Sequence, residues 1–279
     1  MTKSVSERAP RGPDAPGPWL AGIGVLAVEA DPREPFVRLP DPTTKVIVRS
    51  EGRGRPTLLV SGPHVRATYH EGKRDVSCVE VRLAPGATRP LLGVPAVDLV
   101  GRIVPLGALP GPAARRLAYE LGRLEPEEVA GRLADVLPDR LPTAADGARA
   151  ALLRAAVTAL SVRSGRTPGH VGKVARELAV SERELRKLFS DGVGLSPKHY
   201  ARIDRVRAVL AHATELAPAE LAAVTGYYDQ SHMTSDFRNP KSARDPRLPF
   251  TAPYLETTWP SCPEQPPAAP CSPRSEPGC

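Results

Sequence analysis

Two stretches of this chain, residues 171–189 and 220–238, repeat one three-part pattern. Each begins with a short apolar helix, passes through a tight turn, and continues into a second helix that carries polar side chains outward. Ser181, followed three residues later by Glu184, forms a capping box at the second helix of the first stretch, and Asp229 is the expected N-cap in the other. The pattern predicts two helix-turn-helix units.

Apolar residues at helical spacing give each unit an inner face. Gly226 stands in the turn of the second unit, where a left-handed residue is needed. The expected inward residues are Val171, Val174, Ala175, Leu178, Leu185, Leu188 and Phe189 in the first unit, and Leu221, Ala222, Val224, Met233 and Phe237 in the second.

A third helix is predicted between the two units. Ser196 followed by Pro197 is a strong helix start, and the helix should run to about Ala213. At about 1.5 Å per residue it spans roughly 25 Å. With the width of the flanking units it could set two recognition helices about 34 Å apart, one turn of the duplex. We expect Tyr200, Ile203, Val206 and Leu210 to face inward and Arg202 and Arg205 to face outward.

The outward residues of the second helix in each unit suit base edges in a major groove. Arginine pairs well with guanine and glutamine with adenine, while serine and histidine reach base edges or phosphates. The alternative for His232 is an ordinary surface or capping histidine. The candidate DNA-binding residues are Arg183, Arg186 and Lys187 in the first unit and Gln230, Ser231, His232 and Ser235 in the second.

Charge is concentrated in the same part of the chain. The formal net charge is +7, and residues 163–250 contain 15 Lys and Arg against 10 Asp and Glu, a local excess of 5. A local positive excess favours a polyanionic partner such as nucleic acid. A basic surface can also serve solubility alone, so the charge supports the pattern without deciding it.

The amino-terminal half has a different period. Short runs rich in Val, Ile and Leu at 45–50, 57–62, 65–70 and 76–83 predict strands of a small barrel or sandwich. The apolar run 19–28 imitates a signal peptide, but four prolines precede it, and we expect a disordered leader that runs into a first strand of a cytoplasmic protein. A brief helix is expected near residues 96–100.

Helical spacing begins after Pro110, with helices predicted at 115–124, 127–137 and 148–162. The resulting fold class is α+β. The predicted divisions are a disordered leader (1–18), a strand-rich sensor domain (19–109), a helical linker or dimerisation region (110–166), a paired helix-turn-helix domain (167–250) and a disordered Pro-rich tail (251–279).

Residues 167–238 resemble the paired helix-turn-helix DNA-binding domain of the AraC/XylS-type bacterial transcription regulators. The resemblance is carried by SERELRKLF from Ser181, GLSPKHYARIDRVR from Gly194 and GYYDQSHMTSDFR from Gly226. It implies that the candidate residues given above face the bases. The strand-rich half, with LLVSGP and APGATRPLLGVPA, more loosely resembles the poorly characterised domain that often precedes this reader.

The chain departs from that family at three places. Ala179 occupies the first turn, where the family often has glycine, and a left-handed alanine costs on the order of 1 kcal/mol. Ser235 stands where many members carry a basic residue. Phe237 is followed by RNPKSARDPRLPF instead of the family's closing turn and last helix, and Pro240 would interrupt a continuing helix. These departures put the second unit in question.

The expected function is that of a sequence-specific DNA-binding transcription regulator, controlled by a small-molecule effector or by self-association through the amino-terminal domain. Expected partners are double-stranded DNA, an effector, a second copy of the chain and, for an activator, RNA polymerase. We expect no membrane span, no cofactor, no catalytic residues and no metal site, because the four cysteines lack zinc spacing and form no disulfide framework. Cys78 is expected to be a small buried hydrophobe.

Two alternatives remain open. One is a protein-interaction module whose DNA reader has decayed. The other is an enzyme built on the strand-rich half, with His64, His70 and Glu80 as metal ligands or general bases.

Overall fold

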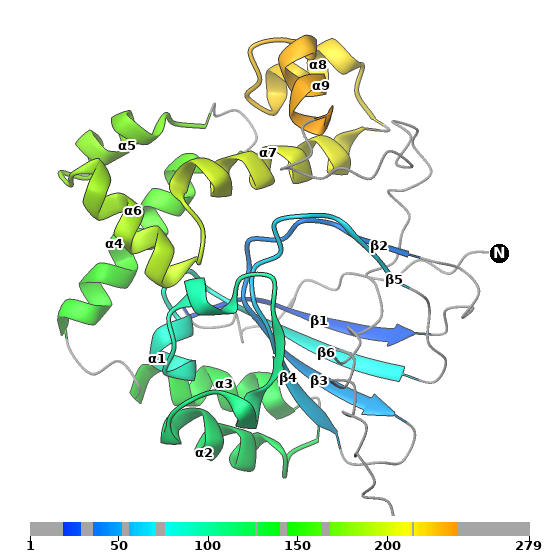
Figure 1. The fold of residues 1–279 in the computed structure, drawn as a ribbon, viewed down its shortest axis with the longest axis vertical. Helices are drawn as coiled ribbons and strands as arrows, with labels where there is room; N and C mark the ends of the chain where they lie inside the picture. The colour runs from blue at the N-terminus through cyan, green and yellow to red at the C-terminus, as the bar shows by residue number, and fades with distance from the viewer. Residues whose placement is uncertain are drawn as a thin grey trace, which may run out of the picture.

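The computed structural model describes residues 19–28, 36–51, 56–70, 76–125, 128–139, 144–162, 168–213 and 215–238. Within these residues, an amino-terminal antiparallel sheet is followed by a helical carboxy-terminal region (Figure 1). The predicted α+β class is confirmed. The predicted leader and tail, and the sequence after α9, lie outside the described residues.

The strands form two sheets. Five of them are hydrogen-bonded in the order β1 (Leu20–Val28), β6 (Val76–Leu83), β3 (Lys45–Glu51), β4 (Thr57–Ser61) and β7 (Ile103–Pro105), all antiparallel. The shorter strands β2 (Phe36–Arg38) and β5 (Thr68–His70) pair separately. The sequence predicted β3, β4 and β6 to within a residue, whereas the run at 65–70 contributes only its last three residues to β5.

Alternation along the central strands gives the large sheet one apolar face. Val46 and Val48 of β3 and Val79 and Val81 of β6 belong to the hydrophobic core. The alternate residues point to the other face, which is also buried and carries charged groups beside Ile47 and Cys78: Lys45, Arg49 and Glu80 are each less than 9% exposed. Burial of charged groups on a sheet requires partners, and these are described below.

Short helices cover the apolar face. They are α1 (Thr88–Leu92), the 3₁₀ helices η1 (Ala96–Leu99) and η2 (Leu106–Ala108), α2 (Pro112–Leu121) and α3 (Glu128–Asp139). The expected helix near 96–100 is therefore a 3₁₀ turn. Leu117 and Leu121 of α2 and Val129 and Leu133 of α3 are fully buried in the same core as the sheet valines.

A second core forms around α4 (Ala144–Leu160). Its residues Leu153, Ala156 and Leu160 pack with those of α5 (Val171–Glu177), α6 (Glu182–Gly192) and α7 (Pro197–His212). The helices of the predicted linker region thus belong to two different cores. Helices α2 and α3 pack with the sheet, and α4 packs with the first helix-turn-helix unit and α7. The chain then continues through α7 to α8 (Pro218–Val224) and α9 (Gln230–Arg238), at the top of Figure 1.

Cys78 is fully buried in β6, as expected. It is disulfide-bonded and is therefore not a free thiol; the other three cysteines lie outside the described residues. No helix among the described residues is long and apolar enough to cross a membrane.

Candidate nucleic-acid interface

The first unit consists of α5, a left-handed turn and α6. Ala179 in the turn has φ +53°, the only positive value at a non-glycine position among the described residues. Ser181 caps α6, its Oγ accepting a hydrogen bond from the backbone N–H of Glu184 at 3.1 Å. The predicted turn and cap are confirmed. The inner faces meet as expected through Val174, Ala175, Leu185, Leu188 and Phe189, with Val171 and Leu178 partly buried against them.

The outer face of α6 is cationic. Arg183, Arg186 and Lys187 are all exposed on this helix, three or four residues apart. Arg186 approaches Glu182 at 2.7 Å, but both side chains stay on the surface, 61% and 49% exposed. An ion pair this exposed is worth little and is screened by salt, so it leaves the guanidinium able to contact a phosphate or a base.

The carboxy-terminal end of α6 is fastened to the rest of the molecule. The N–H of Gly86, in the loop after β6, donates to the carbonyl oxygen of Gly192 at 3.1 Å. Asp191 lies between Arg89 of α1 and Arg149 of α4, at 3.7 and 3.2 Å. A Cβ on Gly192 would overlap a Leu153 methyl and lie 3.2 Å from the Gly86 backbone, so this contact requires glycine.

Helix α7 connects the two units, and its predicted start is confirmed. Ser196 Oγ accepts a hydrogen bond from the N–H of His199 at 3.2 Å. Burial, with the nearby Arg202 guanidinium, lowers the pKa of His199 below its usual value. Leu210, expected on the inner face, is only half-buried. The buried residues of α7 are Pro197, Tyr200, Ala201, Ile203, Val206 and Val209.

The prediction that Arg202 and Arg205 face outward is wrong. Both lean on α9: Arg202 Nε lies 3.0 Å and an Arg205 Nη 3.9 Å from the carboxylate oxygens of Asp236. The Arg205 guanidinium also lies 5.2 Å from the ring centroid of Tyr227. Periodicity placed these arginines opposite the α7 core, but it could not show that α9 covers that side. Asp236 carries no recognisable sequence signal for the same reason.

The second unit repeats the geometry of the first. Gly226 has φ +77° in its turn, and Asp229 caps α9, its Oδ1 accepting the N–H of His232 at 2.7 Å. Leu221, Ala222 and Met233 are buried as predicted, whereas Val224 is 49% exposed, so its inward assignment is wrong. The side chain of Phe237 lies outside the described residues.

The predicted contact residues of α9 lie on its open side. Gln230, Ser231, His232 and Ser235 are all exposed, and the His232 ring packs edge-on against Tyr227 at 5.3 Å. A shallow pocket is lined by Gln230, Ser231, Thr234 and Ser235. The structure thus brings these four candidates to one surface. Whether they contact bases stays a prediction.

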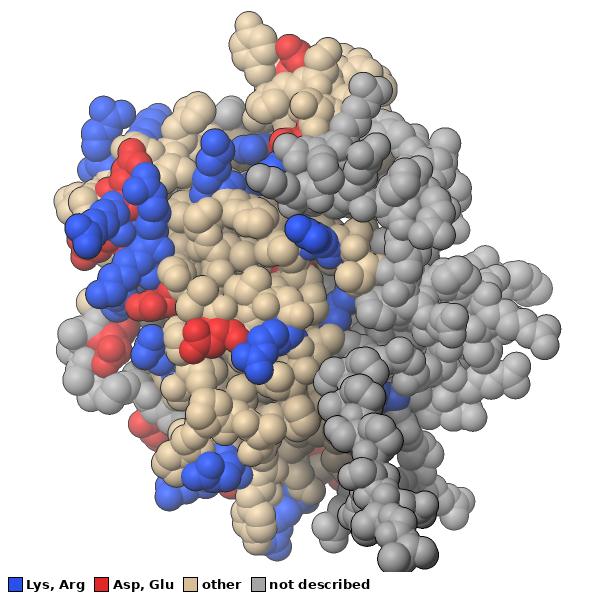
Figure 2. Space-filling view, viewed as in Figure 1, with Lys and Arg blue, Asp and Glu red and all other residues tan. Residues whose placement is uncertain are grey.

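The two units differ in charge. Residues 168–193 contain 5 Lys and Arg against 4 Asp and Glu, a net +1, while residues 215–238 contain 1 against 4, a net −3. Figure 2 shows Lys and Arg side chains gathered over α5 and α6, while the α8–α9 lobe presents uncharged and acidic surface in that view. Attraction for a polyanion is therefore unequal along the proposed interface.

A buried ionic cluster lies on the face of the sheet opposite the core valines. Lys45 Nζ is 2.9 Å from Asp41 and 3.2 Å from Glu80, with side chains 1%, 4% and 6% exposed. Burial would raise the pKa of Asp41, but Lys45, Arg207 and Arg82 together hold it well below its usual range. Burial lowers the pKa of Lys45, and Asp41 and Glu80 oppose that shift.

Helix α7 contacts this cluster directly. Arg207 donates to the carbonyl oxygen of Pro40 at 3.0 Å, one residue before Asp41. A residue of the helix that joins the two helix-turn-helix units therefore contributes to the electrostatics of the strand domain. No local sequence pattern indicates this contact, because 167 residues separate its partners.

Two residues of the enzyme alternative, His64 and Glu80, have different direct partners. His64 Nε2 is 3.0 Å from Ser61 Oγ, which also accepts a hydrogen bond from Arg38, and Glu80 pairs with Lys45. The side chain of His70 lies outside the described residues. Among the described residues, no group of three or more His, Cys, Asp or Glu could hold a metal ion.

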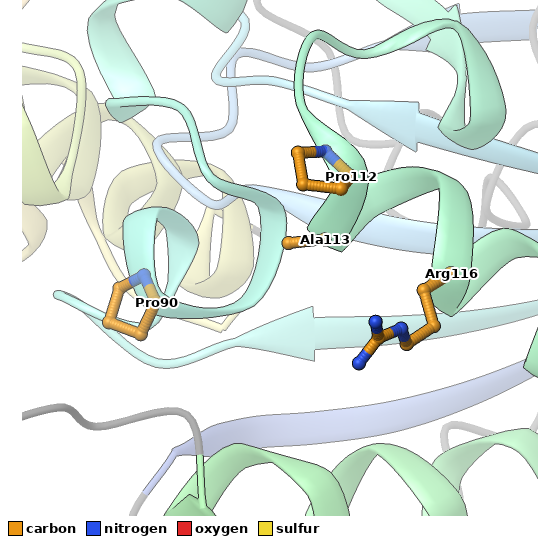
Figure 3. A pocket seen from close by; sticks show the side chains of 4 residues that line it. All are labelled: Pro90, Pro112, Ala113 and Arg116. Carbon is orange, nitrogen blue, oxygen red and sulfur yellow. The ribbon is translucent and has the colours of Figure 1, made fainter.

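A further surface pocket lies by α1 and α2, lined by Pro90, Pro112, Ala113 and Arg116 (Figure 3). Arg116 is the one ionisable group of this lining.

Comparison with known proteins agrees with the predicted helix-turn-helix domain. Residues 174–241 match a family model described as a helix-turn-helix domain. No curated protein matches the chain. Among solved structures, ToxT of Vibrio cholerae has 10% identity over 77% of this chain and 91% of its own, with a TM-score of 0.37. ToxT bound to a methylnaphthalenyl butenoic acid gives 10% identity, 77% and 94% coverage and a TM-score of 0.38. At this distance no site residue or ligand carries over.

The match covers both units and the connecting helix, whose caps, left-handed turns and inner faces have just been described. Its limits also agree with the stretch singled out by the repeated pattern. The chain therefore carries an AraC-type helix-turn-helix domain, the DNA-binding module of a family of transcription regulators.

Proposed function

We propose that the chain is a sequence-specific transcription regulator that reads adjacent major-groove segments with α6 and α9. The observation that supports this most directly is the outer face of α6, where Arg183, Arg186 and Lys187 stand exposed on a capped and buried helix. Phosphate contacts would supply affinity, and a few base-edge contacts would supply specificity. Catalysis is no part of this proposal.

The amino-terminal domain would control the reader through an effector or through self-association. In support, the buried cluster at Asp41 and Lys45 is in contact with α7 through Arg207. A ligand or a second copy that changed this cluster would act on the helix joining the units. DNA is the central partner in this proposal, and RNA polymerase would join it if the regulator activates.

Binding to DNA duplexes as a function of salt tests the proposal. The full chain should bind promoter fragments with an affinity whose logarithm falls linearly against log salt. Arg183→Ala with Arg186→Ala should lower affinity for the preferred fragment at least tenfold and, for each lost phosphate contact, make the slope shallower by about 0.9.

The matched control is Arg115→Ala with Arg116→Ala, which removes the same charge from the exposed face of α2. This variant should bind like the unaltered chain. Binding that ignored salt and was equally insensitive to both double variants would refute the proposal.

A further inference from the structure

The second recognition helix is held on the connecting helix by charged groups. Asp236 of α9 lies against Arg202 and Arg205 of α7, and all three side chains are largely shielded, 15%, 21% and 22% exposed. Arg202 also donates to the backbone oxygen of Asp236 at 3.4 Å. Two helices are thus joined by an ion pair and a hydrogen bond that converge on one residue.

The contact reaches the open surface of α9 through aromatic rings. Arg205 lies over Tyr227, which is 5% exposed, and Tyr227 packs edge-on against His232. Burial and the Asp236 carboxylate raise the pKa of Tyr227 well above its usual value, so its hydroxyl stays neutral. A change at Asp236 would therefore alter the packing around His232, one of the candidate base-contacting residues.

The described apolar core of the second unit is small. Among the described residues it contains five buried ones, Val209, Leu221, Ala222, Tyr227 and Met233, and α9 has nine residues. The core of the first unit has thirteen buried residues, including three from α4. With so small a core, the orientation of α9 depends strongly on the polar contacts.

We propose that Asp236 is a positioning residue for DNA recognition: its contacts with Arg202 and Arg205 fix the orientation of α9, and hence the spacing between the two half-sites that the chain selects. This inference rests on the proposed function. It has a second consequence, because the same contacts withhold two arginines of α7 from phosphates beside a unit whose net charge is −3.

The test is selection of binding sites from a random-sequence duplex library by the full chain and by Asp236→Asn. The unaltered chain should select two half-sites at one spacing. Asp236→Asn should select the same first half-site, with the spacing to the second broadened or lost. Because Arg202 and Arg205 become free to contact phosphates, its slope of log affinity against log salt should steepen by up to about 1.8, taking about 0.9 per phosphate.

Two further variants separate positioning from general effects. Glu220→Gln removes an exposed carboxylate from the same unit and should leave the selected spacing unchanged. Arg202→Asp with Asp236→Arg re-forms the pair with reversed charges and should restore the single spacing. If Asp236→Asn unfolds the second unit, the reversed pair still tests the positioning role.

The outcomes distinguish the inference from the function on which it rests. If the unaltered chain selects no sequence, the proposed function fails. If it selects two half-sites and Asp236→Asn selects them at the same single spacing, the positioning role fails while the function stands. The role also fails if the reversed pair keeps the helical content of the unaltered chain but does not recover its spacing, or if the unaltered chain selects one half-site alone.

Discussion

The turns of the two units hold different residues in one backbone conformation, and this predicts opposite effects on stability. Ala179 has φ +53° and Gly226 has φ +77°. A left-handed conformation costs an L-residue about 1–2 kcal/mol, whereas glycine adopts it freely. Ala179 is exposed, so Ala179→Gly removes strain without uncovering apolar surface.

The magnitudes follow from the structure. Ala179→Gly gains about 1–2 kcal/mol by relief of strain and loses about 0.4–1 kcal/mol because glycine makes the unfolded chain more flexible. The net result lies between about zero and 1.6 kcal/mol, with a central stabilisation of about 0.8 kcal/mol. Gly226→Ala introduces the same strain and places a Cβ 2.7 Å from Pro168 Cδ. With about 1–3 kcal/mol for overpacking, less about 0.4–1 kcal/mol from a stiffer unfolded chain, it should destabilise by about 1–5 kcal/mol.

Urea unfolding followed by far-UV circular dichroism measures both changes. The control is Ala151→Gly, at an exposed position inside α4, where glycine should cost about 1 kcal/mol. Ala179→Gly should raise the free energy of unfolding while Ala151→Gly lowers it. If Ala179→Gly lowered the free energy of unfolding as much as Ala151→Gly does, the proposed strain at Ala179 would be refuted.

Three other predictions concern stability. Asp41→Asn leaves the buried cations beside it poorly compensated and should cost about 3–5 kcal/mol in urea unfolding, against less than about 0.5 kcal/mol for the exposed Asp98→Asn. Because the pKa of Asp41 is held below its usual value, its stabilisation should be complete above about pH 4 and decline as the pH falls further; the variant should lack this part of the acid dependence. Gly62→Ala would place a Cβ on the Leu99 carbonyl and should unfold the strand domain; wild-type thermal stability would contradict this. Ser181→Ala should lose about 1 kcal/mol as the cap of α6 is removed, measured by the same urea titration, and an unchanged midpoint would show that the cap contributes nothing.

Features fixed by neighbours in the sequence could be predicted. The caps at Ser181, Ser196 and Asp229 depend on a side chain and an N–H three residues away, and all three form as expected. The bounds of α7 follow from Ser196 and Pro197 at its start. The repeated unit was recognisable because these local signals agree with its apolar spacing.

Features that depend on distant partners could not be predicted. Leu117 and Val129 show that a helix has an apolar face, but not that this face packs on the sheet. Nothing within β3 shows that Asp41 and Glu80 lie against Lys45 and allow its complete burial. Arg205 was expected in solvent, because nothing in α7 itself reveals that α9 lies against it.

Helix α4 determines which parts of this protein could be exchanged with others. Leu153, Ala156 and Leu160 complete the core beneath α6, although they precede the reader in the chain. A recombinant fragment beginning at residue 167 would lack these α4 residues, and the buried side chain of Phe189 would become exposed to solvent. A chimaera that grafts this DNA-binding half onto a foreign sensor would therefore need its junction upstream of Ala144.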